Sequence, residues 1–229
     1  MPNETSGLVI ATPENVAELL AMPEPPPRIW WEKAEMELCL VPAGEFLMGS
    51  AEGDKEAGSD EKPQHRVYLS AYYIGRYPVT QAQYARFVQG MGHPVPRVEE
   101  RYSPPYDWDQ ERKAPPHGRE NHPVVLVSWD DASAFCRWAG LRLPTEAEWE
   151  KTARGSADMR MYPWGDEAPD CSRLNFNGCI GDTSRVGDYP SGASPYGCAG
   201  RNVHPFEGLL FRVYNPLGLF RLNGRSLSG

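Results

Sequence analysis

Apolar and polar positions follow two periods along the chain, and each period predicts a different kind of element. Residues 36–50 read as two short strands around a turn at Pro42, so we expect a hairpin there. Residues 67–73 alternate between apolar and polar side chains, which predicts one half-buried strand. A brief apolar strand is predicted at residues 122–129 and a last one at residues 219–222. All of these strands are short.

Three helices are predicted from residues that cap helix starts. Thr80 and Thr145 are each followed, three positions later, by a glutamine or glutamate that completes a capping box. Ser128 caps a third helix, which we expect to end at Gly140. The apolar positions inside these segments recur at helical spacing, so each helix buries one face.

The elements predict one domain behind an N-terminal extension. Residues 1–34 hold a short helix at 13–20 and a proline-rich run at 23–27, which we interpret as a spacer. Residues 35–229 form the domain, and much of it lacks either period. The expected fold class is therefore α+β and irregular, with few short helices, small antiparallel sheets and long loops.

Composition supports this interpretation and excludes some partners. The 229 residues include 22 glycines and 23 prolines, which is typical of a loop-rich chain. The net charge of −8 disfavours binding to nucleic acid or to an anionic membrane surface. No apolar run is long enough to span a membrane, and no signal peptide is recognisable, so we expect a cytoplasmic protein.

The sequence does not decide whether its five cysteines are reduced or disulfide-bonded. They are Cys39, Cys136, Cys171, Cys179 and Cys198. An odd number cannot pair completely within one chain, and none of them forms a CxxC motif. We favour reduced, buried thiols, and the alternative is a single Cys171–Cys179 bridge across a loop.

A segment rich in asparagine and aspartate follows the helices. Asn175, Asn177, Asp182 and Asp188 offer the oxygen ligands that calcium prefers. The same side chains also stabilise turns by bonding their own backbone, and their spacing does not separate the two interpretations.

Three motifs give the chain a family resemblance. VPAGEFLMGS at 41–50, LPTEAEWE at 143–150 and YPWGDE at 162–167 resemble the formylglycine-generating enzyme, or sulfatase-modifying factor, family. The resemblance covers residues 37–197 and implies a C-type-lectin-like fold. It also implies calcium binding by Asn175 and the carbonyl of Phe176, with Asp182 as a further candidate.

Active members of that family use two C-terminal cysteines to bind copper, activate oxygen and convert the cysteine of a CxPxR peptide to formylglycine. In this chain the block that normally follows residue 197 is missing, and Cys198 resembles a structural cysteine beyond the active pair. The resemblance therefore implies a scaffold without the oxidase machinery, a pseudoenzyme.

We accordingly expect a non-catalytic domain that binds a protein or a small molecule. The family includes variable proteins of diversity-generating retroelements, which display a changeable C-terminal surface, and the tail of this chain is rich in residues favoured at contacts. The candidate ligand-binding residues are Arg201, Asn202, His204, Phe206, Phe211, Arg212, Tyr214 and Asn215. The apolar tail residues could instead fill a core.

The alternative functions are a copper-dependent formylglycine-generating oxidase and an internally deleted, inactive fragment.

Overall fold

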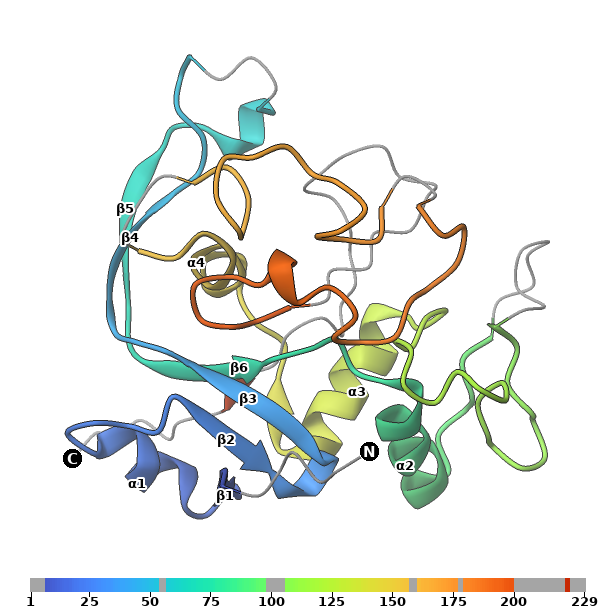
Figure 1. Cartoon of the computed structure of the whole chain (residues 1–229). Helices are drawn as coiled ribbons and strands as arrows, with labels where there is room; N and C mark the ends of the chain where they lie inside the picture. Colours follow the sequence, from blue (N-terminus) through green and yellow to red (C-terminus); the bar gives the residue numbers. More distant parts are fainter. Residues whose placement is uncertain are drawn as a thin grey trace.

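Short strands and helices alternate with long irregular segments in the computed structural model (Figure 1). The structure describes residues 7–53, 57–97, 106–156, 160–176, 179–199 and 221–222. Its strands are β1 (Val9–Ala11), β2 (Arg28–Trp31), β3 (Met36–Val41), β4 (Gly44–Met48), β5 (His65–Leu69), β6 (Tyr72–Gly75), β7 (Leu141–Arg142) and β8 (Arg221–Leu222). Its helices are α1 (Val16–Ala21), α2 (Gln81–Met91), α3 (Trp129–Ala139) and α4 (Glu146–Arg154), with 3₁₀ turns at Glu32–Ala34, Ser59–Glu61 and Pro190–Gly192.

The largest sheet has the order β1-β2-β3-β6. β1 and β2 run parallel and are joined through α1, whereas β3 is antiparallel to both β2 and β6. The helix predicted at 13–20 is thus confirmed as α1. Two of the four strands, β1 and β2, come from the segment that we predicted as an extension, and they share a sheet with β3 and β6. The boundary at residue 35 stays a prediction.

The predicted hairpin at residues 36–50 is wrong in its pairing. Both strands exist, but β3 pairs with β2 and β6, while β4 pairs with β5 in a separate sheet. The chain passes from one sheet to the other at Pro42, and the Lys151 ammonium group holds this crossing by donating to the carbonyl oxygens of Pro42 at 2.8 Å and Gly44 at 2.9 Å. Gly44 has φ of +145°, a conformation that L side chains rarely adopt.

The single strand predicted at residues 67–73 is in fact two. β5 ends at Leu69 and pairs with β4, and β6 begins at Tyr72 and pairs with β3. All four residues of β6 are buried, so the alternation of β5 does not continue into β6. Figure 1 shows β4 and β5 curving together along one side of the molecule before they pass into β3 and β6.

The apolar stretch at residues 122–129 does not form the predicted strand. All of these residues are described, and they form an isolated bridge between Thr80 and Pro123, with hydrogen bonds from Gln81 N to His122 O and from Val124 N to Val79 O, each of 2.9 Å. Leu126 has φ of +61°, which breaks an extended conformation. At the other end, β8 confirms part of the last predicted strand and pairs with β7.

The three helix starts are confirmed. Thr80, Ser128 and Thr145 each accept a hydrogen bond from the backbone of the third helical residue, and each box is closed by the return bond from that residue's side chain. Gly140 ends α3 in the left-handed conformation, with φ of +74°. These signals are local, which is why the sequence predicts them correctly.

Removing one cap gives a test of this local stability. We expect Ser128→Ala to lower the free energy of unfolding by about 1 kcal/mol, because the Asp131 N–H, 3.1 Å from Ser128 Oγ, loses its acceptor. Ser128→Asn keeps a capping acceptor and should retain most of the stability. Urea unfolding of the three proteins measures the difference; equal stability of the alanine and asparagine variants would contradict the capping role.

The core lies between the large sheet and helices α2 and α3. Tyr84 of α2 stacks on Phe135 of α3 with ring centroids 5.7 Å apart, and Phe87 meets Phe135 edge to face at 5.8 Å. Trp31 of β2 is fully buried and donates its indole N–H to the carbonyl of Ala139 at 2.8 Å. The aromatic residues therefore join the N-terminal strands to the helices.

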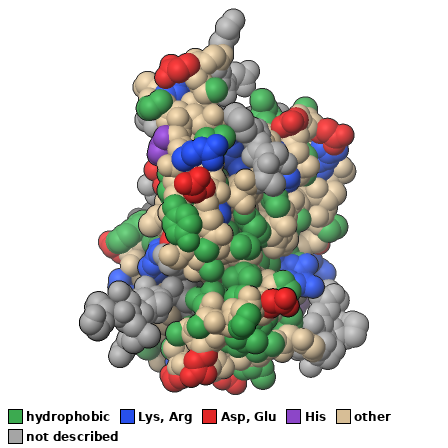
Figure 2. All heavy atoms as spheres, turned by 90° about the vertical axis from the view of Figure 1, so that its left-hand side faces the viewer, with side chains coloured by type: hydrophobic (Ala, Val, Ile, Leu, Met, Phe, Trp, Pro, Cys, Tyr) green, Lys and Arg blue, Asp and Glu red, His purple; other side chains and the backbone are tan. Residues whose placement is uncertain are grey.

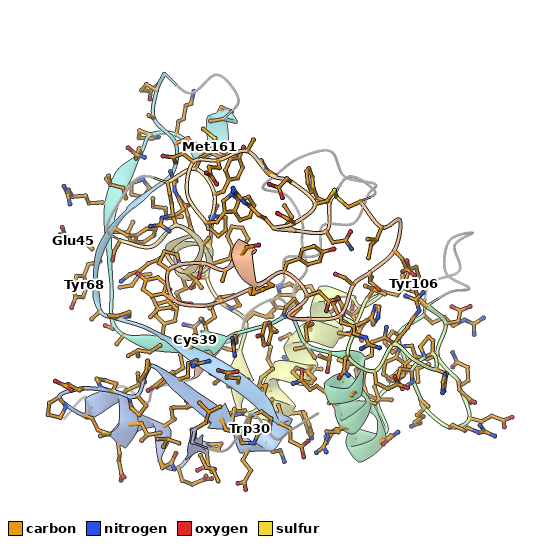
Figure 3. The ribbon with its side chains drawn as sticks, in the orientation of Figure 1. Trp30, Cys39, Glu45, Tyr68, Tyr106 and Met161 are labelled. Carbon is orange, nitrogen blue, oxygen red and sulfur yellow. A yellow bond between two sulfur atoms is a disulfide. The ribbon has the colours of Figure 1, made fainter. Side chains whose placement is uncertain are left out.

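On the face formed by the curved pair β4 and β5, charged side chains of both signs are interspersed with apolar ones (Figure 2). Tyr68 and Glu45, which are cross-strand partners, lie on the outer side of this pair (Figure 3). In the described part of the chain, none of the helices combines the length and apolar character needed to cross a membrane. With few short helices, small sheets and long loops, the structure confirms the predicted α+β class.

Candidate functional site

Two loops that are distant in sequence meet in a group of polar side chains, which we call the loop cluster: Tyr106, Arg119, His122, Asp182 and Thr183. At its centre the Arg119 guanidinium donates to both carboxylate oxygens of Asp182, at 2.8 Å and 2.5 Å. This two-pronged geometry is the strongest form of an arginine–carboxylate pair. The pair joins residues 106–122 to residues 174–188, two segments without helices or long strands.

The other members of the loop cluster surround this pair. Tyr106 donates its hydroxyl to Asp182 at 3.0 Å, and the Arg119 guanidinium lies over the Tyr106 ring at 5.0 Å. Thr183 donates its backbone N–H to Asp182 at 2.6 Å, and its hydroxyl lies 2.9 Å from Nδ1 of His122. A backbone bond from Val186 N to Asn121 O adds a further connection. The two loops are therefore held at several points.

The electrostatics of the loop cluster keep its groups in fixed protonation states. Hydrogen bonds from Arg119 hold the pKa of Asp182 far below its usual range, against the opposing effect of burial. Burial, together with the bond to Asp182, raises the pKa of Tyr106. Burial and then the charge of Arg119 lower the pKa of His122. At neutral pH Asp182 is ionised and Tyr106 protonated, so these groups suit positioning better than proton transfer.

The predicted calcium residues lie beside this cluster. Asn175 is buried and donates its side-chain amide to the backbone carbonyl of Asp182 at 2.7 Å. The carbonyl of Phe176 accepts the N–H of Cys179 at 2.9 Å. The Asp182 carboxylate accepts from Arg119, Tyr106 and Thr183, and its role as a further calcium ligand stays a prediction. Asn175 and Phe176 keep oxygen atoms of the right chemistry, and calcium binding by them stays a prediction.

The paired state of Asp182 predicts how stability depends on pH. Its folded-state pKa is lowered, so its stabilising effect is present above the ordinary aspartate value and is lost as the pH falls through the folded-state pKa. We expect Asp182→Asn to be less stable than the wild type at pH 7, and this gap to narrow in acid. Urea midpoints of both proteins from pH 7 down to pH 2 measure the gap; a gap that stays constant below the ordinary aspartate pKa would contradict the ion pair.

The segment that precedes Asp182 is closed by a disulfide. Cys171 and Cys179 are bonded, with Cα atoms 5.7 Å apart. Our favoured expectation that all five cysteines are reduced is therefore wrong, and the alternative of one Cys171–Cys179 bridge is confirmed. The chain turns back within eight residues, which brings the two Cα atoms into the range that a disulfide spans.

Sequence reasoning missed a second pair of cysteines. Cys39 of β3 and Cys198, which precedes the last described residue of that segment, lie in one buried apolar group, and Cys198 lowers the pKa of the Cys39 thiol. No spacing rule finds such a pair, because the thiols come from opposite ends of the chain. Figure 3 shows Cys39 well away from Tyr106, so the thiol pair and the loop cluster are separate sites.

The motif YPWGDE forms a tight turn. Tyr162 and Gly165 exchange backbone hydrogen bonds of 2.9 and 3.0 Å, and the Tyr162 and Trp164 rings stack with centroids 5.3 Å apart. Arg173 lies over the Trp164 ring at 6.0 Å and pairs with Glu167. The turn thus packs against the segment that contains the disulfide.

The predicted ligand-binding residues fall outside the described part of the chain, as does Asn177. The former are Arg201, Asn202, His204, Phe206, Phe211, Arg212, Tyr214 and Asn215. Their role in binding stays a prediction.

Known proteins share both the sequence and the fold of this chain. The Sulfatase-modifying factor enzyme 1-like domain matches residues 31–225. The formylglycine-generating enzyme of Streptomyces coelicolor is 39% identical over 170 residues, which cover 60% of this chain and 53% of that protein. The hercynine oxygenase of Mycolicibacterium smegmatis is 35% identical over 177 residues, covering 69% of this chain and 41% of that protein. The structure of PvdO from Pseudomonas aeruginosa superimposes with a TM-score of 0.61 and 26% identity, covering 76% of this chain and 69% of that one.

This chain belongs to the sulfatase-modifying factor family. The family match confirms the resemblance, and the similarity to PvdO confirms the formylglycine-generating-enzyme-like form of the C-type-lectin-like fold. The chain spans about half the length of the formylglycine-generating enzyme of Streptomyces coelicolor.

Proposed function

We propose that this chain is a non-catalytic binding domain on the sulfatase-modifying-factor scaffold, with a protein or a small molecule as its ligand. The observation that carries the proposal is the Arg119–Asp182 pair, which fixes two irregular loops against each other. Loops held by a rigid scaffold are where proteins most often place binding residues. Asp182 stays ionised and Tyr106 stays protonated, so these two groups order the loops and do not exchange protons at neutral pH.

The alternative of a copper-dependent formylglycine-generating oxidase is supported less well. Such an oxidase needs thiols that a substrate peptide can approach. Cys39 is fully buried and Cys198 is 8% exposed, and both are enclosed by Val41, Tyr72 and Ile74. An oxidase would need both thiols open to an extended substrate peptide, and Cys39 has no exposed surface, so we rank binding first.

Mass spectrometry of a substrate peptide separates the two functions. The full chain is incubated with copper, oxygen and a CxPxR peptide, beside the Streptomyces coelicolor enzyme as the positive control. We expect the peptide to remain unchanged with this chain. Conversion of its cysteine to formylglycine would overturn the binding proposal.

The proposed ligand surface is the C-terminal tail, which holds arginine and aromatic residues favoured at binding contacts. Full-length protein is applied to an array of glycans and peptides, and any binder is measured again with Tyr214→Ala. We expect that variant to lose affinity, while Arg112→Ala, an exposed arginine of the 106–122 loop, retains it. Equal affinities, or no saturable binder, count against the proposal.

A neighbouring reverse transcriptase gene and a near-copy of the tail's coding sequence would place the chain among the variable proteins of diversity-generating retroelements.

Calcium is the proposed cofactor, with Asn175 and the carbonyl of Phe176 as its ligands. Binding to the folded state raises the thermal midpoint, so we expect added calcium to raise the midpoint of the wild type. Asn175→Ala should remove the calcium-dependent part of that rise. A midpoint that is the same with calcium and with a chelator would eliminate the site.

A further inference from the structure

The backbone fixes Cys39 and Cys198 on neighbouring segments. Cys39 lies within β3, where its partner across the sheet is Ile74 of β6. Cys198 closes a turn in which Ser194 N donates to its carbonyl oxygen at 2.8 Å. The next residue, Ala199, donates its N–H to the carbonyl of Arg76 at 2.9 Å, just beyond the end of β6. Backbone hydrogen bonds therefore anchor both thiols against the same strand.

The two side chains share one enclosed space. Cys39 and Cys198 are 0% and 8% exposed, and Val41, Tyr72 and Ile74 complete the buried group around them. Side chains of cross-strand partners point to the same face of a sheet, which places Cys39 beside Ile74 and toward Cys198. Trp149 and Tyr196 pack against the group from outside. Membership of one buried group, together with the effect of Cys198 on the Cys39 thiol, places the two side chains next to each other.

The surroundings of Cys39 favour reactivity, in contrast to those of Cys136. The hydrogen bond from Cys198 lowers the pKa of the Cys39 thiol, and the charges of Arg76 and Arg28 act in the same direction, whereas burial and Glu37 oppose them. Burial in the helical core raises the pKa of the Cys136 thiol. A thiolate, not a thiol, attacks a disulfide. Cys39 therefore combines a neighbouring thiol with a favoured thiolate, whereas the thiolate of Cys136 is disfavoured.

We propose that Cys39 and Cys198 are a redox-active dithiol, at which a low-molecular-weight disulfide such as oxidised glutathione closes a second intramolecular disulfide. Cys198, the more exposed thiol, passes its proton to the Cys39 thiolate as it attacks the external disulfide, forms a mixed disulfide and releases one thiolate. The Cys39 thiolate then attacks the sulfur of Cys198 and releases the second thiol. Two protein thiols are oxidised, one external disulfide is reduced to two thiols, and the two protons go to those leaving thiolates. The proposal goes beyond the binding role and does not depend on it.

Thiol counting on the wild-type chain tests the proposal without any substitution. The protein is equilibrated at a series of ratios of oxidised to reduced glutathione, quenched with acid, denatured and alkylated, and then weighed. We expect three alkylated thiols at the reducing end of the series and one, on Cys136, at the oxidising end. Proteolytic mapping should then show the Cys39 peptide linked to the Cys198 peptide, separate from Cys171–Cys179. Three alkylated thiols at every ratio would overturn the proposal.

Single variants test the order of the two steps. In Cys39→Ser the mixed disulfide has no resolving thiol, so we expect one glutathione to stay bound at Cys198. In Cys198→Ser we expect no glutathione on Cys39, because that thiol is fully buried. Cys136→Ala is the matched control and should form the Cys39–Cys198 bond as the wild type does. Bound glutathione on Cys39 in place of Cys198, or loss of the bond in the Cys136→Ala control, would contradict the mechanism.

Discussion

Replacing Glu148 by glutamine is expected to lower the free energy of unfolding by about 3 kcal/mol, because it leaves the charge of Arg142 without its partner. The Glu148 side chain is 3% exposed and accepts two bonds from the Arg142 guanidinium, at 3.0 and 2.8 Å. It also accepts the backbone N–H of Thr145 at 2.9 Å, which closes the capping box of α4. Arg142 is 29% exposed and stays partly hydrated, so we place the loss at the lower end of the range for a broken buried pair.

Glu146 supplies the matched control for this variant. It lies in the same first turn of α4, is exposed, and has the same side chain. Glu146→Gln should change the free energy of unfolding by less than about 0.5 kcal/mol. Urea unfolding of both variants measures the contrast. If the two substitutions cost the same, the stability of this segment comes from helix charge in general and not from the Glu148–Arg142 pair.

The second large effect is expected at Trp31. Trp31→Ala should lower the free energy of unfolding by about 3–5 kcal/mol, since it removes a fully buried aromatic side chain that links β2 to the end of α3. Trp31→Phe keeps most of the apolar contact and loses only the bond to Ala139, so we expect a loss of about 1–2 kcal/mol.

The neighbouring tryptophan is the control for Trp31. Trp30 points to the opposite face of β2, is only partly buried, and lies in the lower part of the molecule in Figure 3. Trp30→Ala should therefore cost clearly less than Trp31→Ala in a urea titration. Similar costs for both would show that the strand, and not the buried contact with α3, carries the stability.

The sequence predicts the local elements of this fold and not their pairing. Helix starts at Thr80, Ser128 and Thr145 depend on residues three positions apart, so they are readable without tertiary information. The partner of β4 is β5 and not the adjacent β3, because strand pairing depends on contacts across long stretches of chain. An apolar run such as residues 122–127 is equally ambiguous, since burial alone does not make a strand.

In the candidate site, too, the sequence predicts contacts between residues that are close along the chain and misses contacts between distant ones. Asn175 and Asp182 are close in sequence and do lie together, joined by the bond from the Asn175 amide to the Asp182 carbonyl. Arg119, which donates to the Asp182 carboxylate, comes from a loop more than sixty residues away and belongs to no recognisable motif. Cys39 and Cys198 are further apart still. Contacts of this kind follow from the fold, and only the structure reveals them.

The parallel unit β1-α1-β2 has a practical consequence for anyone who exchanges domains within the family. The family match begins at residue 31, at the last position of β2, so a chimera joined at that point would carry β3 with an unpaired edge. It would also lack Pro13, whose ring lies 3.1 Å from the place a side chain would occupy on Gly140 at the end of α3. A transplant of this domain should therefore start before residue 9 and bring its own two strands with it.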